Sequence, residues 1–153
     1  MKILVVDGQG GGVGRSLVTA LKQRMPRQPI LALGTNAQAT MAMLKAGADQ
    51  AASGENAIRY QCRDADIILG VTGILHCNAM LGEISPGIAM AVSLSEAKKV
   101  LVPLERCGLY VAGVGAQTLD GLVKDAARIA AEMVQSASAA PTENECEKRG
   151  NQR

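Results

Sequence analysis

Short apolar runs alternate with segments of helical period along most of the chain. The runs are continuous, which is typical of parallel strands that are covered by helices on both faces. We expect strands at residues 2–7, 30–34, 66–72, 99–103 and 109–114, and a weaker short strand at 50–52.

The segments between these runs predict helices. In 13–25 the apolar residues Leu17, Val18 and Leu21 fall on one face, and in 118–135 they recur at spacings of three and four. Further helices are expected at 36–46, 55–61 and 86–98. This order predicts a doubly wound parallel sheet, a Rossmann-like three-layer α/β sandwich of five or six strands.

The length of 153 residues suits one domain. We place this Rossmann-like, nucleotide-binding domain at residues 1–135. Beyond it the sequence turns to Ser, Ala, Pro, Thr, Glu, Asn, Lys and Arg without apolar period, so 136–153 is expected to be a disordered tail.

Charge and composition exclude several classes of partner. The 16 basic and 14 acidic residues nearly balance and form no basic patch, and Trp and Phe are absent, so we expect no nucleic-acid binding. No segment approaches a membrane span, and the chain opens on a strand without a leader, so we expect a cytoplasmic protein.

The stretch 84–94 carries almost no charge. It suits either a helix buried within the monomer or a helix whose outer face packs on a second copy. A small domain has few places to hide such a helix, so we expect a homodimer through 84–94.

A glycine-rich turn links the first strand to the first helix. Five glycines occur within seven residues, which read Gly8, Gln9, Gly10, Gly11, Gly12, Val13 and Gly14. Such a turn can allow positive φ and close approach of a phosphate to backbone N–H groups at a helix N-terminus. The alternative is a tight turn without a ligand, for which one or two glycines would suffice.

The glycine spacing resembles two families. Gly8, Gly12 and Gly14 give G-x-x-x-G-x-G, which resembles the cofactor loop of short-chain dehydrogenases/reductases, whereas residues 11–16 are similar to the deviant P-loop of ParA-like ATPases. Arg15 stands where those ATPases need Lys. We therefore rank a dinucleotide, NAD or NADP, above a nucleoside triphosphate.

Residues that follow other strands complete the predicted cofactor site. We expect Thr35 and Asn36 near a ribose or a 2′-phosphate, with Thr72 and Gly73 at the same edge of the sheet. A Tyr-x-x-x-Lys motif is missing, since Asp64 follows Tyr60 and Val114 follows Tyr110 at that spacing. The reaction thus stays open, although an oxidoreductase is the expected class for an enzyme.

Other side chains at this edge suggest a rival interpretation. His76, Cys77 and Cys107, with Glu105, could form a metal or redox site, although their spacing matches no known framework. The rival is a non-enzymatic interaction or regulatory protein that uses this site. Further carboxylates expected at the edge are Asp7, Glu55 and Glu83. Cys62 precedes its strand and belongs at the opposite edge.

Over nearly its whole folded length the chain resembles a family of small uncharacterised proteins of anaerobic bacteria. The resemblance covers the following segments: 2–12, 34–36, 46–49, 54–57, 62–66 and 81–84. It implies the Rossmann-like fold and no particular chemistry.

Overall fold

A single parallel sheet forms the centre of the computed structural model, which describes residues 1–104 and 109–139. The strands of these residues are β1 (Ile3–Asp7), β2 (Ile30–Gly34), β3 (Gln50–Ser53), β4 (Ile67–Val71) and β5 (Lys98–Val102). They pair in the order β3-β2-β1-β4-β5, and every pairing is parallel. This confirms the predicted doubly wound sheet.

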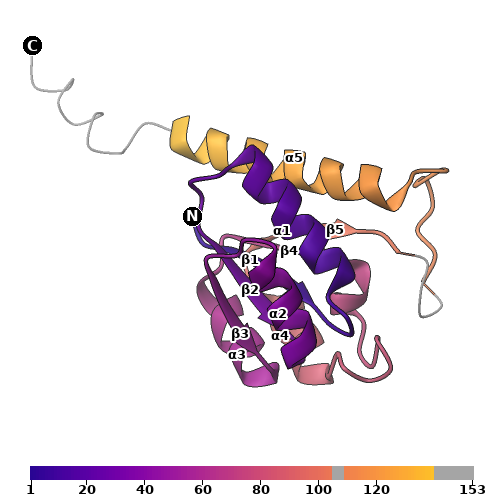
Figure 1. The fold of residues 1–153 in the computed structure, drawn as a ribbon. Helices are drawn as coiled ribbons and strands as arrows, with labels where there is room; N and C mark the ends of the chain where they lie inside the picture. The colour runs from indigo at the N-terminus through magenta and orange to yellow at the C-terminus, as the bar shows by residue number, and fades with distance from the viewer. Residues whose placement is uncertain (105–108, 140–153) are drawn as a thin grey trace, which may run out of the picture.

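Helices cover both faces of the sheet (Figure 1). On one face lie α1 (Gly12–Arg24), α2 (Ala37–Lys45) and α5 (Leu119–Ala139), and on the other lie α3 (Glu55–Gln61) and α4 (Pro86–Leu94). Two short 3-10 turns, η1 (Cys62–Asp64) and η2 (Thr72–Leu75), flank β4. The chain changes faces between β1 and β4, which are neighbours in the sheet. In open α/β sheets, ligands bind at the carboxyl ends of the strands at such a switch point.

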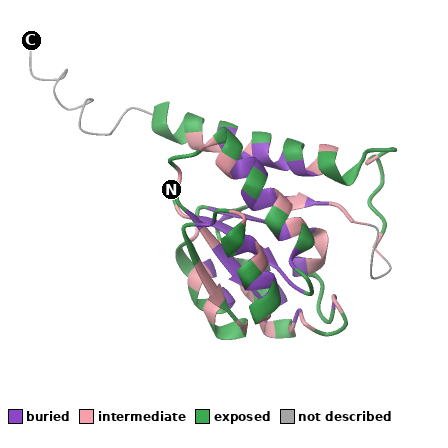
Figure 2. Ribbon diagram, viewed as in Figure 1, coloured by how far each residue is buried: buried purple, intermediate pink, exposed green. Residues whose placement is uncertain are grey.

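Alternate residues of β1 point into two separate aliphatic cores. Ile3 and Val5 pack beneath α1 and α5, whereas Leu4 and Val6 pack beneath α3 and α4. Figure 2 shows the resulting buried strands between half-exposed helices. Val13 packs against both cores, as does Leu104 at the end of β5.

The strand predicted at 109–114 is wrong. Residues 109–114 run as an irregular segment before α5, with Tyr110 79% exposed. Gly113 (φ 88°) and Gly115 (φ 64°) adopt left-handed backbone, which a strand cannot continue through. The apolar character of this segment therefore did not produce sheet pairing.

Two helix boundaries also differ from the prediction. The helix expected at 86–98 ends at Leu94, because β5 already begins at Lys98. At the C-terminal side, α5 continues to Ala139, so residues 136–139 are helical, and the rest of the predicted tail, 140–153, lies outside the described residues. None of the described helices is long and apolar enough to cross a membrane.

Candidate functional site

A pocket of about 550 Å³ opens at the carboxyl ends of β1 and β4, the switch point of the sheet. Its size suits a small organic ligand. One side is the β1–α1 turn, and the other is the connection between β4 and α4. The lining residues are Asp7, Gly8, Gln9, Gly10, Gly11, Gly12, Val13, Arg15, Ser16, Val71, Gly73, Ala79, Met80, Leu81, Leu104 and Leu119.

The β1–α1 turn folds tightly because two of its residues are left-handed. Gln9 has φ 48° and Gly11 has φ 67°. The Gly11 N–H donates to the Gly8 carbonyl at 2.9 Å, which closes the turn. A Cβ on Gly11 would lie 2.7 Å from Ala39 Cα, so both its backbone conformation and the contact with α2 require glycine.

The remaining glycines of the turn divide into two groups. A Cβ on Gly14 would lie 2.6 Å from Met43 Sδ, and one on Gly8 would lie 2.7 Å from Met80 Sδ. Close packing therefore accounts for both. A Cβ on Gly10 would meet only Gln38 Nε2, at 3.9 Å, and one on Gly12 would meet nothing within 4 Å. The described packing leaves room for side chains at Gly10 and Gly12, and both residues line the pocket.

Some backbone N–H groups of the turn have an acceptor among the described residues, and others do not. The Asp7 carboxylate accepts from Gly8 at 2.8 Å and from Gly14 at 2.7 Å, and the Glu83 carboxylate accepts from Gln9 at 2.8 Å. For Gly10 and Gly12, no acceptor is found among residues 1–104 and 109–139. These two N–H groups therefore remain for a ligand.

Asp7 joins the end of β1 to the start of α1. Its side chain is only 5% exposed, and this burial raises the pKa of the carboxyl. Hydrogen bonds from Gly14 and Gly8 oppose the rise, whereas the charge of Glu83 adds to it. The carboxyl is thus a structural acceptor for the turn.

Glu83 holds the residues that were expected to bind a ribose. Its Oε2 accepts from the Thr35 hydroxyl at 2.5 Å and from Asn36 Nδ2 at 2.9 Å, in addition to the Gln9 N–H. Desolvation would raise the pKa of Glu83, but these three hydrogen bonds outweigh it and lower the pKa. Neither Thr35 nor Asn36 lines the pocket in this structure.

The β4–α4 connection supplies the apolar wall of the pocket. Met80 and Leu81 lie there with φ of 56° and 59°, and Leu81 is 97% exposed. Leu104, two residues after β5, and Leu119, the first residue of α5, also line the pocket. Sequence reasoning missed Met80 and Leu81, since an apolar pair between two helices has no spacing that marks it as a ligand wall.

Of the four predicted metal ligands, the structure describes only His76 and Cys77. His76 and Cys77 are both exposed, and no group of three or more His, Cys, Asp or Glu side chains in the described residues could hold a metal ion. Cys107 and Glu105 lie outside the described residues. Cys62 lies at the opposite edge as expected, and burial raises the pKa of its thiol to about 11.

Thr72 and Gly73 begin η2, directly after β4. Gly73 lines the pocket. The Thr72 hydroxyl is buried and has no hydrogen-bond partner among the described residues. Its role in ligand binding therefore stays a prediction.

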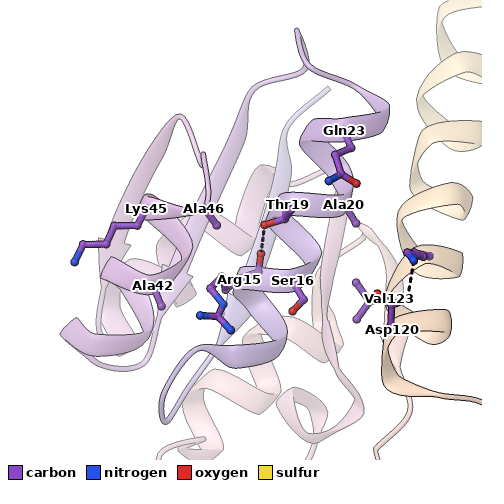
Figure 3. A pocket seen from close by; sticks show the side chains of 11 residues that line it. Arg15, Ser16, Thr19, Ala20, Gln23, Ala42, Lys45, Ala46, Asp120 and Val123 are labelled. Atoms are coloured by element: carbon purple, nitrogen blue, oxygen red, sulfur yellow. Dashed lines mark hydrogen bonds and ion pairs between the residues drawn. The ribbon is translucent and has the colours of Figure 1, made fainter.

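A second pocket, of about 500 Å³, lies on the other side of the first turn of α1 (Figure 3). It runs between α1, α2 and α5, and Arg15 and Ser16 line both pockets. Lys124 beside it pairs with Asp120 at 2.6 Å, and the Thr19 hydroxyl donates to the Arg15 carbonyl at 3.0 Å. Because Arg15 lines both pockets, its positive charge lies between them.

Comparison with protein families gives one decisive result. The model of the domain of unknown function DUF3842 matches residues 2–135, nearly the whole described chain. The chain belongs to this family. The match confirms the expectation of a Rossmann-like family without an assigned activity, and no curated protein matches the chain.

Among solved structures, the DUF3842 chain is similar to a dodecameric FMN-dependent UbiX-like decarboxylase from Escherichia coli O157:H7. The TM-score is 0.50 and the sequences are 16% identical, over 88% of this chain and 95% of the decarboxylase chain. The expectation of NAD or NADP is contradicted, since the neighbour is described as FMN-dependent. In addition, Glu83 occupies the donors of Thr35 and Asn36 that were assigned to the ribose.

Proposed function

We propose that this DUF3842 domain binds a flavin mononucleotide in the switch-point pocket. The phosphate would accept from the N–H groups of Gly10 and Gly12, and the flavin ring would lie against Met80, Leu81 and Leu104. The carrying observation is that Gly10 and Gly12 combine open space where a Cβ would be with N–H groups that have no acceptor in the described part of the chain. The FMN dependence of the UbiX-like decarboxylase, whose fold is similar, supports the choice of flavin.

The charges of the turn favour one phosphate over two. Asp7 and Glu83 already accept from three N–H groups of the turn, namely those of Gly8, Gln9 and Gly14. A pyrophosphate would need more donors and would lie closer to both carboxylates, whereas a single phosphate fits the two remaining donors. Arg15 supplies a positive charge beside it.

The proposal is tested by titrating FMN and riboflavin into the protein. FMN at about a hundred times its dissociation constant should stabilise the fold by about 2.7 kcal/mol, which thermal melting detects. Riboflavin has the same ring without the phosphate and should bind at least about tenfold more weakly, because a hydrogen bond to a charged group contributes about 1.5–3 kcal/mol.

The matched variants are Gly12→Ala and Gly121→Ala. Gly12→Ala adds a methyl group that touches nothing in the protein, so FMN affinity should fall while stability holds. Gly121→Ala adds the same group to a helical glycine outside the pocket and should leave FMN affinity unchanged. Equal binding of FMN and riboflavin, or equal affinity of wild type and Gly12→Ala, would remove the phosphate site from the glycine turn.

We further propose self-association through 84–94. Ile88, Ala89 and Val92 are buried within the monomer, which leaves Met90 and Leu94 exposed by 59% and 76%. These two side chains form the apolar face that a second copy would cover. Sedimentation equilibrium should give a mass above the monomer for wild type and the monomer mass for Met90→Glu/Leu94→Glu; a monomeric wild type would contradict the proposal.

A further inference from the structure

Three hydrogen-bond donors converge on a single oxygen of Glu83. The donors are the Gln9 N–H at 2.8 Å, the Thr35 hydroxyl at 2.5 Å and the Asn36 side-chain amide at 2.9 Å. They come from the β1–α1 and β2–α2 turns, whereas Glu83 comes from the β4–α4 connection. The first two turns thus form an oxyanion cradle, defined here as Gln9 N, Thr35 Oγ1 and Asn36 Nδ2, and a third segment fills it.

Contacts that do not involve Glu83 also position the donors of the cradle. Asn36 Oδ1 accepts from the Ala39 N–H at 2.8 Å, and its Nδ2 also donates to the Gln9 carbonyl at 3.0 Å. The Thr35 N–H donates to the Asp7 carbonyl at 3.0 Å. These contacts fix the donors on α2 and β1, so removing Glu83 would leave them in place and without an acceptor.

The segment that carries Glu83 is short and strained. Its middle residues Leu81 and Gly82 are exposed, whereas Met80 packs against the core. It runs from Met80 to Glu83 between two buried residues, Ala79 and Ile84. Met80 and Leu81 hold positive φ without being glycine, a conformation that costs free energy and is often found at binding sites. Because Leu81 is 97% exposed, packing of its side chain does not offset the free-energy cost of this conformation. Release of this segment would relieve the strain and would keep its two buried ends anchored.

Glu83 also lies near a second carboxylate. A Cβ on Gly8 would lie 2.9 Å from Glu83 Oε2 and 2.8 Å from Thr35 Oγ1, and Gly8 itself donates to Asp7. Two acidic side chains therefore flank one glycine. Burial and the charge of Glu83 raise the pKa of Asp7, whereas the three donors outweigh desolvation and hold the pKa of Glu83 itself below its ordinary value.

We propose that the cradle is a binding site for the carboxylate or phosphate group of a small molecule, and that Glu83 is its built-in occupant, which the ligand displaces. The same three donors would bind the incoming oxyanion. Met80 and Leu81 would move with Glu83, so binding at the cradle would reshape the apolar wall of the neighbouring pocket. This site is distinct from the Gly10–Gly12 site and does not rest on flavin binding.

The probes are inorganic phosphate and acetate. Every protein in the test is the full chain and carries Gly12→Ala, which reduces probe binding at the glycine turn. An occupied site lowers apparent affinity by the fraction of empty molecules. Glu83→Ala should therefore bind at least one probe about tenfold or more tightly than the Gly12→Ala parent, with Glu83→Gln between them. Tighter phosphate binding assigns a phosphate ligand, and tighter acetate binding a carboxylate ligand. Adding Thr35→Val should remove most of the gain.

Hydrogen exchange of residues 79–84 gives a second readout that needs no change at Glu83. Saturating probe should speed exchange in the parent, because the segment leaves the cradle. The proposal is overturned if both Glu83 variants bind no more tightly than the parent, if the gain survives Thr35→Val undiminished, or if the bound parent exchanges no faster. Loss of flavin binding in Gly12→Ala bears only on the other site, so the two proposals fail separately.

Discussion

Two segments face each other across the switch-point pocket, and both contain left-handed backbone. The β1–α1 turn reaches positive φ at Gln9 and Gly11, and its glycines pack against α2. The β4–α4 connection reaches positive φ at Asn78, Met80, Leu81 and Gly82, of which only Gly82 is glycine. The glycine-rich turn therefore places one non-glycine residue in this costly conformation, whereas the opposite segment places three.

The contrast separates a rigid binding surface from an adjustable one. The β1–α1 turn is fixed by Asp7, which bonds both Gly8 and Gly14. The opposite segment contacts the β1–α1 and β2–α2 turns through the side chain of Glu83, and Leu81, two residues earlier, is exposed. We expect substitutions on the two sides to differ in sign as well as in size.

Gly11→Ala should have the largest effect on stability. The new Cβ would be 2.7 Å from Ala39 Cα and 2.8 Å from its carbonyl oxygen, on a residue with positive φ. Overpacking and the left-handed conformation together should cost about 2–5 kcal/mol. Urea unfolding measures this, with Gly12→Ala as the control that stays within about 0.5 kcal/mol of wild type. Equal stability of the two variants would mean that α1 and α2 are not in close contact.

Leu81→Gly should have a smaller effect of the opposite sign. Glycine removes the left-handed penalty of about 1–2 kcal/mol, and the greater freedom of the unfolded chain returns about 0.4–1 kcal/mol of that gain. The net stabilisation is expected at about 0.5–1 kcal/mol. Leu44→Gly is the matched control, since Leu44 is also exposed but lies in helix α2, away from the proposed self-association face. It should lose about 1 kcal/mol, and a loss of that size for Leu81→Gly would disprove the strain.

The smallest effect concerns pH. The pKa of Glu83 is lowered in the folded state, so its contribution to stability is present above the unfolded value near 4.5 and is lost as pH falls through the folded pKa. For this partly exposed group we expect less than about 1 kcal/mol. The difference in unfolding free energy between wild type and Glu83→Gln should therefore shrink on acidification.

Asp7 gives the opposing control on the rigid side of the pocket. Its pKa is raised, so its stabilisation is present below 3.8 and declines as pH rises through the folded pKa. The difference between wild type and Asp7→Asn should shrink toward neutral pH instead. If the two differences change in the same direction with pH, the pKa values of Asp7 and Glu83 are not shifted in opposite directions.

The sheet was predictable because its signal is local and repeated. Continuous apolar runs such as Ile30–Gly34 are typical of strands buried on both faces, and Asp7 with the glycines after it marks the edge where ligands bind. The run at 109–114 was equally apolar, yet it contains Gly113 and precedes Gly115, both in left-handed conformations. Apolar content alone could not distinguish a strand from a partly covered connection.

The site was predictable on one side only. A glycine-rich turn can be recognised in a sequence. The hydrogen bonds from Thr35 and Asn36 to Glu83, however, join residues that are 48 and 47 positions apart. No spacing rule connects such a carboxylate with its donors. In the sequence, Thr35 and Asn36 look like free donors for a ribose. In the folded chain both side chains already donate to Glu83.

Val13 and Leu104 give the pocket an influence beyond its own rim. Both residues pack against the two aliphatic cores, and both line the pocket. A ligand that presses on them would join the two layers of the sandwich at a common point. The empty protein could then open one layer at a time, whereas the occupied protein would have to melt as one cooperative unit.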